Sequence, residues 1–170
     1  KYAIGVSSGT SGLHLCVRAA GIGSGDLVLT SPFSFVASTN VILYENAIPV
    51  YVDVQADTGN IDPALARQAA HDLAQGGSTA RRWHPRQAIE KKSRLKALLP
   101  IDIFGQPCDL TAMQSIATKY QIPWIEDACE ALGSEYRGTK VGLQGDMAVY
   151  AFYPNKQITT GEGGMIVTDD

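Results

Sequence analysis

Short apolar runs alternate with helix-like segments along most of this chain, and no other feature constrains the fold as strongly. Apolar runs predict strands that begin at Leu27 or span residues 48–54, 96–103, 122–127, 147–152 and 164–168. Periodic apolar positions and helix-start residues predict helices over residues 10–20, 34–44 and 110–120, and from Asp62 onward. This alternation predicts an α/β fold of three layers, in which helices cover both faces of a mostly parallel sheet.

Residues 75–94 interrupt the alternation. This segment begins Q-G-G-S-T-A-R-R and is polar and basic throughout, which predicts a surface insertion or a mobile loop. The chain opens almost at once with V-S-S-G-T and closes at M-I-V-T-D-D, within a strand pattern. We therefore expect a fragment of a longer protein.

Composition excludes several classes of protein. With 170 residues, 45% of them apolar, the chain can form one domain with a sizeable core. A net charge of −3 argues against nucleic acid as the main partner. No run is apolar and long enough to cross a membrane, and K-Y-A-I-G-V-S-S lacks the pattern of a signal peptide. The three cysteines lack metal-type spacing, so we expect reduced thiols in a cytoplasmic protein and no metal site.

Small and hydroxyl residues gather in S-S-G-T-S-G, residues 7–12, where the first helix is expected to start. Free N–H groups and the helix dipole make such a start a possible anion site. A plain helix cap explains the same residues equally well.

An acidic pair ends the apolar strand in W-I-E-D-A, residues 124–128. Ligands of open α/β sheets bind at the carboxyl ends of strands, so one acid there could hold a cation or a protonated ring nitrogen. Taken alone, the local alternative, an aspartate that caps the next turn, is the simpler explanation.

Lys156 stands between an apolar strand that ends near Pro154 and a turn rich in threonine and glycine. An amine attacks a carbonyl only after it loses its proton, which desolvation or a nearby cation favours. Taken alone, a surface lysine explains the position. Combined with an anion-binding helix start and an acid for a ring nitrogen, the lysine completes the set of groups that holds pyridoxal phosphate.

Six blocks, in order, resemble the DegT-type nucleotide-sugar aminotransferases of pyridoxal-phosphate fold type I. The blocks are V-S-S-G-T-S-G-L-H-L, G-S-G-D-L-V-L-T-S-P-F-S-F-V-A-S-T-N, I-P-V-Y-V-D-V-Q-A-D-T-G-N-I-D-P, I-D-I-F-G-Q-P-C-D-L, I-E-D-A-C-E-A-L-G and F-Y-P-N-K-Q-I-T-T-G-E-G-G. No single block is decisive, but six in this order are specific. The resemblance implies that residues 1–170 form part of the large cofactor-binding domain, without the small C-terminal domain.

The resemblance also implies roles for individual residues. Lys156 matches the lysine that forms a Schiff base with the cofactor and moves a proton during transfer. Asp127 matches the acid that keeps the pyridine nitrogen protonated, and Phe35 matches the aromatic residue that stacks on the pyridine ring.

Further cofactor contacts follow from the same resemblance, with two departures. The phosphate-binding turn is matched by Gly9, Thr10 and Ser11. Glu130 matches a position near the phenolic oxygen of the cofactor that is usually glutamine or histidine, and a carboxylate there would repel a phenolate. Ala151 stands where many relatives have a serine that binds the phosphate, so one hydrogen bond would be missing.

The resemblance implies an aminotransferase that acts on a nucleotide-linked keto-sugar, with glutamate or glutamine as amino donor. It places such an enzyme in polysaccharide or antibiotic-sugar biosynthesis, and it implies a homodimer that completes the site across subunits. Three alternatives were weighed. Lys156 argues against the related dehydratases, which have histidine there. A regulatory protein would need a DNA-binding element that is not evident. The lysine, the acid and the phosphate turn argue against an inactive remnant, but the expected truncation keeps that alternative open, and the fragment alone could be inactive.

Overall fold

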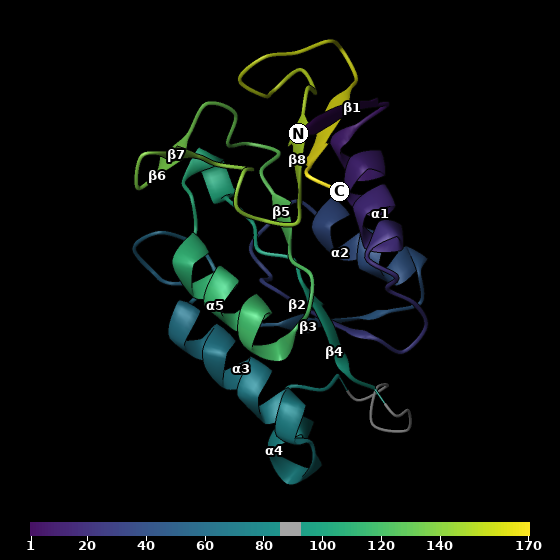
Figure 1. Cartoon of the computed structure of the whole chain (residues 1–170), viewed down its shortest axis with the longest axis vertical. Helices are drawn as coiled ribbons and strands as arrows, with labels where there is room; N and C mark the ends of the chain where they lie inside the picture. The colour runs from purple at the N-terminus through teal and green to yellow at the C-terminus, as the bar shows by residue number, and fades with distance from the viewer. Residues whose placement is uncertain (86–92) are drawn as a thin grey trace.

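The computed structural model describes residues 1–85 and 93–170, and it is built in three layers (Figure 1). Helices α1 (Gly9–Ala19) and α2 (Ala37–Tyr44) cover one face of the sheet. Helices α3 (Pro63–Gln75) and α5 (Leu110–Tyr120) cover the other face. The predicted three-layer α/β architecture is confirmed.

Four strands form one half of the sheet. β5 (Ile125–Asp127) pairs in parallel with β8 (Met147–Ala151). β9 (Gly164–Thr168) joins β8 in the antiparallel direction, and β1 (Tyr2–Val6) joins β9 likewise at the edge. Strands β5 and β8 therefore run in the same direction, and their carboxyl ends lie at the same edge of the sheet.

Three parallel strands form the other half. β2 (Leu27–Thr30) lies between β3 (Ile48–Tyr51) and β4 (Leu95–Leu98). Two isolated parallel bridges connect this half to the segment that contains β5, and they are Leu98–Trp124 and Ile101–Asp127. The carboxyl ends of β4, β5 and β8 consequently lie along one edge of the sheet, where ligands of α/β sheets bind.

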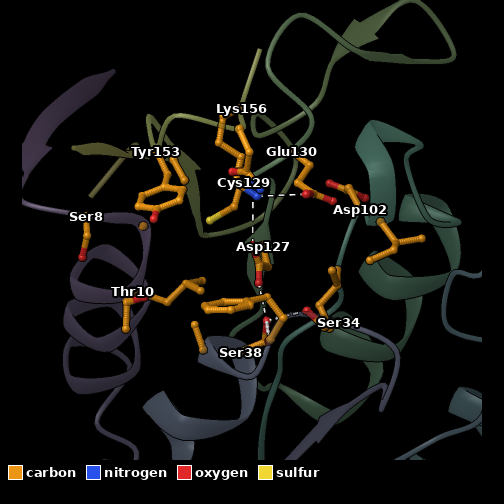
Figure 2. A pocket seen from close by; sticks show the side chains of 18 of the residues that line it. Ser8, Thr10, Ser34, Ser38, Asp102, Asp127, Cys129, Glu130, Tyr153 and Lys156 are labelled. Atoms are coloured by element: carbon orange, nitrogen blue, oxygen red, sulfur yellow. Dashed lines mark hydrogen bonds and ion pairs between the residues drawn. The ribbon is translucent and has the colours of Figure 1, made fainter. Parts of the chain in front are cut away.

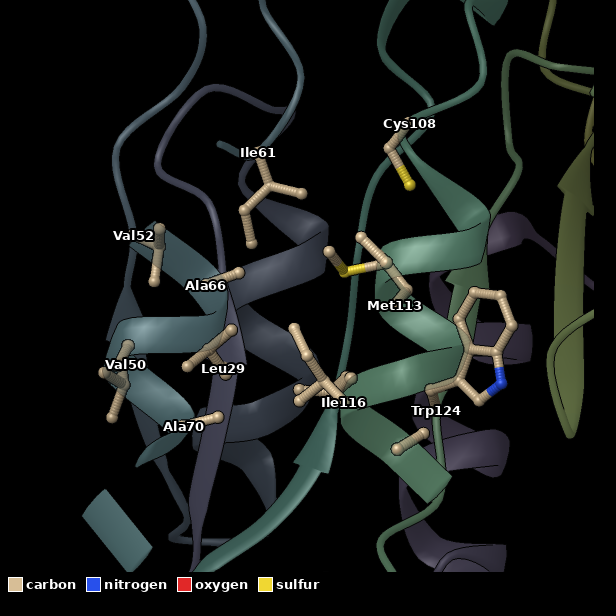
Figure 3. Close-up of a cluster of buried hydrophobic side chains, with 14 of the residues drawn as sticks. Leu29, Val50, Val52, Ile61, Ala66, Ala70, Cys108, Met113, Ile116 and Trp124 are labelled. Atoms are coloured by element: carbon tan, nitrogen blue, oxygen red, sulfur yellow. The ribbon is translucent and has the colours of Figure 1, made fainter. Parts of the chain in front are cut away.

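The buried side chains form two apolar clusters, one on each face of the sheet. In β2 the side chains alternate, so that Leu27 and Leu29 face α3 and α5 while Val28 faces α1 and α2. Figure 3 shows the first cluster, in which Leu29 lies near Ala70 of α3 and Ile116 of α5. Burial on both faces explains why the whole of β2 is apolar.

Several boundaries differ from the sequence-based expectations. α2 begins at Ala37, not at residue 34, and the Ser34 hydroxyl instead forms a 2.8 Å hydrogen bond with the Ser38 hydroxyl. The strand predicted over residues 96–103 ends at Leu98, because Pro100 cannot donate a ladder hydrogen bond and the chain then turns. The turn is a short 3-10 helix, Ile103–Gly105.

Two more strands are shorter than expected, and three were not predicted. The strand expected over residues 48–54 ends at Tyr51, and the one expected over 122–127 begins at Ile125, after Pro123. Residues 2–6 form β1, whose side chains are mostly exposed and so lack the pattern of a buried strand. The short hairpin of β6 (Glu135–Tyr136) and β7 (Thr139–Lys140) was also missed.

The first part of the interrupting segment is anchored to the domain. It forms the short helix α4 (Gly77–Arg81), in which Ala80 is buried. The indole N–H of Trp83 then donates a 2.8 Å hydrogen bond to Asp72 of α3. Residues 86–92, in the second half of this segment, lie outside the described residues, and the surface insertion or mobile loop over residues 75–94 stays a prediction.

Within residues 1–85 and 93–170, no helix combines the length and the apolar character needed to cross a bilayer. The same residues contain no cluster of His, Cys, Asp and Glu side chains suited to hold a metal ion.

Candidate active site

A cavity of about 690 Å³ opens at the carboxyl ends of the strands (Figure 2). Its wall combines the start of α1, the segment before α2, the ends of β5 and β8, and the turn after β4. Six of the seven site residues expected from the sequence lie on this wall, and they are Gly9, Thr10, Phe35, Asp127, Glu130 and Lys156.

Lys156 enters the cavity from a tight turn after β8. The backbone N–H of Lys156 donates to the carbonyl of Tyr153 (2.9 Å), which fixes the turn beyond Pro154. Its side chain is 14% exposed, and the amine nitrogen lies 2.9 Å from Oε1 of Glu130. The lysine is therefore held by backbone and side chain, and its amine points into the cavity together with Glu130 (Figure 2).

Glu130 uses both of its carboxylate oxygens. While Oε1 contacts Lys156, Oε2 accepts a 3.0 Å hydrogen bond from the N–H of Phe104. Phe104 has a left-handed backbone, with φ of +54°, which is unfavourable for a large side chain. Glu130 thus links a strained turn to the lysine, and the positive charge of the amine compensates the carboxylate in this arrangement.

Asp127 is the last residue of β5 and is buried. Its Oδ2 accepts a 2.6 Å hydrogen bond from the hydroxyl of Ser38 in α2, and its Oδ1 accepts one of 3.3 Å from the N–H of Cys129. These two donors hold the carboxyl group in one orientation. A carboxylate with this environment, at the wall of the cavity, can bind a protonated ring nitrogen.

Helix α1 begins at the opposite end of the cavity. Ser8 caps the helix and lines the cavity, as do Gly9 and Thr10. Ser11 does not line it, because its hydroxyl accepts from the N–H of Ser8 (2.9 Å) in a capping box. The sequence had left open whether this segment caps a helix or binds an anion. Ser8 and Ser11 form the cap, and Ser8, Gly9 and Thr10 also face the cavity, where an anion could bind.

Close packing surrounds Gly9. A Cβ atom at this position would lie 2.7 Å from Cβ of Ala151 and 2.9 Å from Sγ of Cys129. Only glycine fits at this position without displacing these neighbours. Ala151 contributes a methyl group to the cavity wall at this place, and no hydroxyl.

Cys129 is the second potential nucleophile on the wall. Burial, and next the negative charge of Asp127, raise the pKa of its thiol well above the usual value. A protonated thiol is a weak nucleophile. Lys156 is therefore the group on this wall that is suited to attack a carbonyl.

Aromatic side chains surround the cavity mouth. Phe35, expected to stack on a ring, is 74% exposed, and Phe33 packs edge-to-face on Phe104 with ring centroids 5.8 Å apart. Sequence reasoning missed Ser8, Ser38, Asp102 and Tyr153 as wall residues. The only signal for Ser38 was its place in the S-P-F-S-F-V-A-S block, which does not reveal that it reaches Asp127.

These residues fit pyridoxal phosphate, which has an anionic phosphate, an aldehyde and a ring nitrogen. The helix start at Gly9 suits the phosphate, Asp127 suits the protonated nitrogen, and the amine of Lys156 suits the aldehyde. An α/β sheet that presents these three groups around one cavity defines the large domain of pyridoxal-phosphate enzymes of fold type I.

Comparison with known proteins narrows this class to a family. The profile of the DegT/DnrJ/EryC1/StrS aminotransferase family matches residues 1–170, and the chain belongs to this family. GDP-perosamine synthase of Caulobacter vibrioides is 39% identical over 170 residues, which cover all of this chain and 40% of that protein.

Two solved structures support the assignment. A DegT DnrJ EryC1 StrS aminotransferase from Brucella abortus superimposes with a TM-score of 0.86 at 28% identity, over 100% of this chain and 42% of the other. NtdA from Bacillus subtilis, solved with the bound cofactor PMP, superimposes with a TM-score of 0.78 at 30% identity, over 100% of this chain and 34% of the other. The chain spans about 40% of the length of the curated relatives it matches.

Proposed function

We propose that the protein containing this chain uses pyridoxal phosphate to transfer an amino group to a keto-sugar linked to a nucleotide. Glutamate or glutamine is the proposed donor, and synthesis of a cell-surface polysaccharide or an antibiotic sugar is the proposed context. The observation that carries the proposal is the presence of Lys156, Asp127 and the start of α1 around one cavity. The name GDP-perosamine synthase, borne by a relative at 39% identity, supports a nucleotide-linked sugar as substrate.

The residues of the chain have separate tasks in this proposal. The amine of Lys156 would hold the cofactor through its aldehyde carbon, with loss of water, and the same amine would accept and donate the proton that moves during transfer. Asp127 holds a proton on the ring nitrogen, while Ser38 fixes the orientation of the carboxylate. The N–H groups of Gly9 and Thr10 bind the phosphate, and the ring of Phe35 covers one face of the cofactor.

When bound, the cofactor supplies an electron-withdrawing ring that stabilises negative charge on the substrate carbon. The buried carboxyl group of Asp127 would hold the ring nitrogen and favour its protonated form. Glu130 lies between the lysine and the turn at Phe104, and it holds the amine in place before the cofactor binds.

A coupled assay of the intact protein against a panel of nucleotide keto-sugars, with glutamate and glutamine as donors, tests the proposal. We expect amino transfer and a lysine-dependent cofactor absorbance band, with both lost in Lys156→Ala. Lys140→Ala is the matched control, because Lys140 is a lysine on the exposed hairpin, where it pairs with Glu135. A cofactor band that persists in Lys156→Ala, without any transfer by the wild type, would support a non-catalytic or regulatory relative instead.

We also propose a homodimer and a cytoplasmic location for the intact protein. Large apolar side chains at the cavity mouth are exposed in the single chain, among them Phe35 and Phe104. A second subunit that covers them would complete the site. The cysteines are free, which fits a reducing compartment. Light scattering tests the dimer, and fractionation of cells tests the location.

A further inference from the structure

Two carboxyl groups, those of Asp102 and Glu126, are buried together beside the cavity. Asp102 is 1% exposed and Glu126 is 0% exposed. One oxygen of each has a backbone donor, since Cys108 N–H donates to Asp102 Oδ1 (2.9 Å) and Gly142 N–H donates to Glu126 Oε1 (2.8 Å). The remaining oxygens, Oδ2 of Asp102 and Oε2 of Glu126, are buried without another donor in the described part of the chain.

The parallel bridge between Ile101 and Asp127 places the side chains of the neighbouring residues Asp102 and Glu126 on the same face of the sheet. Besides burial, the interaction between the two side chains shifts the pKa of both carboxyl groups. Neither belongs to an ion pair among residues 1–85 and 93–170. Two carboxylates that face each other away from water, with no cation between them, would be strongly unfavourable. A single proton between Oδ2 and Oε2 removes one charge and gives both oxygens a hydrogen bond.

Among the residues that the structure describes, none of the titratable groups that interact with the pair supplies a positive charge. Asp127 acts on Asp102, and the two carboxyl groups act on Cys108 and Tyr150. The N–H of Gly145 contributes a further backbone hydrogen bond to Glu126. Burial raises the pKa of the Tyr150 phenol to about 12 and that of the Cys108 thiol well above its usual value, so both are neutral. Burial first, and then the charge of Glu126, raise the pKa of Asp102 well above its usual value, and burial also raises that of Glu126.

Asp102 stands at the start of a chain of contacts that ends at Lys156. Its N–H donates to the carbonyl of Asp127 (3.1 Å), and the next residues form the 3-10 turn Ile103–Gly105. The N–H of Phe104 in this turn holds Glu130, and Glu130 holds the lysine amine (2.9 Å). Figure 2 shows Asp102, Glu130 and Lys156 along one side of the cavity.

We propose that Asp102 and Glu126 hold one proton between them at neutral pH, and that this proton fixes the turn from which Glu130 and Lys156 are positioned. Asp102 is thus a positioning residue for the site. The positioning role rests on the proposed function, whereas the shared proton does not. Loss of the proton at high pH leaves two facing anions, which loosens the turn.

The sign of the pH dependence follows from the direction of the shifts. A carboxyl group whose pKa is raised in the folded state binds its proton more tightly there than in the unfolded chain. The folded state is therefore favoured at low pH, and stability falls as pH rises from about 4, the unfolded value, through the raised folded value. An ordinary surface carboxylate produces no such fall.

Amide substitutions test the shared proton without removing atoms. In Asp102→Asn or Glu126→Gln the amide N–H₂ replaces the proton as donor to the remaining carboxylate, so each single variant should fold and lose the alkaline fall in stability. In the double variant both amide oxygens stay with Cys108 N–H and Gly142 N–H, so two N–H₂ groups face each other. We expect the double substitution to raise the unfolding equilibrium constant at least about tenfold more than the product of the changes caused by the two single substitutions.

The measurements are denaturant unfolding of the intact protein between pH 5 and pH 9 and infrared spectroscopy at pH 7, neither of which requires cofactor or activity. The wild type should show the carbonyl band of a protonated carboxyl group, which Asp102→Asn or Glu126→Gln should abolish. Asp57→Asn, at an exposed acid, is the control for the change of charge and should retain the band. Any of three results would overturn the shared proton. The wild type could lack the carbonyl band, the effects of the two amide substitutions on the free energy of unfolding could simply add in the double variant, or the single variants could keep the pH dependence of the wild type.

The positioning role has its own readout, the pH profile of pyridoxal phosphate binding by absorbance. Wild-type affinity should decline at alkaline pH, and Asp102→Asn should remove most of that decline. An identical decline in both proteins would overturn the positioning role while leaving the shared proton intact. If neither the wild type nor Asp102→Asn binds the cofactor at any pH, the proposed function is refuted and the positioning role with it. The unfolding and infrared results would still decide whether the two carboxyl groups share a proton.

Discussion

The hydroxyl of Ser38 donates a 2.6 Å hydrogen bond to the Asp127 carboxylate, although 89 residues separate the two in the chain. The bond joins α2, on one face of the sheet, to the end of β5. It explains how a strand-end aspartate keeps one orientation at the cavity wall.

Replacing Asp127 should affect the reaction far more than replacing Ser38. Asp127→Asn keeps the shape but removes the charge that holds a proton on the ring nitrogen, and we expect kcat to fall by at least about a hundredfold. Ser38→Ala removes one hydrogen bond to a charged group, at a cost of about 1.5–3 kcal/mol, and leaves the charge in place. Steady-state kinetics of both variants provides the comparison, and an equal loss in the two would contradict the separate roles.

Gly9→Ala should disturb the phosphate end of the site. The added methyl group would lie 2.7 Å from Cβ of Ala151, so the start of α1 or the end of β8 must shift. We expect a loss of stability of about 1–3 kcal/mol together with weaker cofactor binding. Gly23→Ala is the matched control, because a Cβ at Gly23 meets no atom within 4 Å. Denaturant unfolding and cofactor titration should separate the two variants, and similar behaviour would argue against a tight cradle at Gly9.

Glu130→Gln should alter the rate at which the cofactor becomes attached. The ion pair between Glu130 and Lys156 has to open before the amine reaches the aldehyde. Since the pair is partly exposed, its removal should raise the association rate by up to about fivefold. Stopped-flow absorbance measures this rate. Glu130→Ala also removes the acceptor for Phe104 N–H, so only that variant should destabilise the strained turn. Equal stability of Glu130→Gln and Glu130→Ala would show that the hydrogen bond from Phe104 does not stabilise the turn.

The interrupting segment should depend on Asp72 for its attachment. Hydrogen bonding from Trp83, followed by the charge and hydrogen bond of Arg82, lowers the pKa of Asp72. A lowered pKa means that this stabilisation is present above the unfolded pKa of about 3.9 and is lost as pH falls through the folded value.

We therefore expect Asp72→Asn to lower the melting temperature at pH 7 and to have little effect at pH 2. Trp83→Phe, which keeps an aromatic ring but no donor, should show part of the same effect. Thermal unfolding at the two pH values checks this, and a larger loss at pH 2 than at pH 7 would reverse the assigned sign.

Local signals were sufficient to predict many elements of the fold. Helix α5 covers the predicted residues 110–120, where the Asp109 side chain caps it by accepting from Ala112 N–H. Prolines shortened the predicted strands, because Pro100 and Pro123 lack the N–H that a ladder needs. β1 escaped prediction since its exposed edge position requires no apolar pattern.

The site was predictable only in part. The motifs of Lys156, Asp127 and Gly9 were ambiguous when taken alone, and they indicated a cofactor site only in combination and through the family resemblance; the structure brings all three residues to one cavity wall. The bond from Ser38 to Asp127 and the carboxyl pair of Asp102 and Glu126 depend on which strands and helices become neighbours in space. No local pattern contains that information. Ser11 shows the converse, since its motif suggested phosphate binding but its hydroxyl is used within the helix cap.

Lys156 is the residue that we propose binds the cofactor covalently. Borohydride reduction of the intact protein loaded with pyridoxal phosphate would make the carbon–nitrogen bond permanent, and mass spectrometry of the digest would locate it. We expect one added cofactor group, on the peptide that contains Lys156. A protein modified only at other lysines, or not at all, would contradict it.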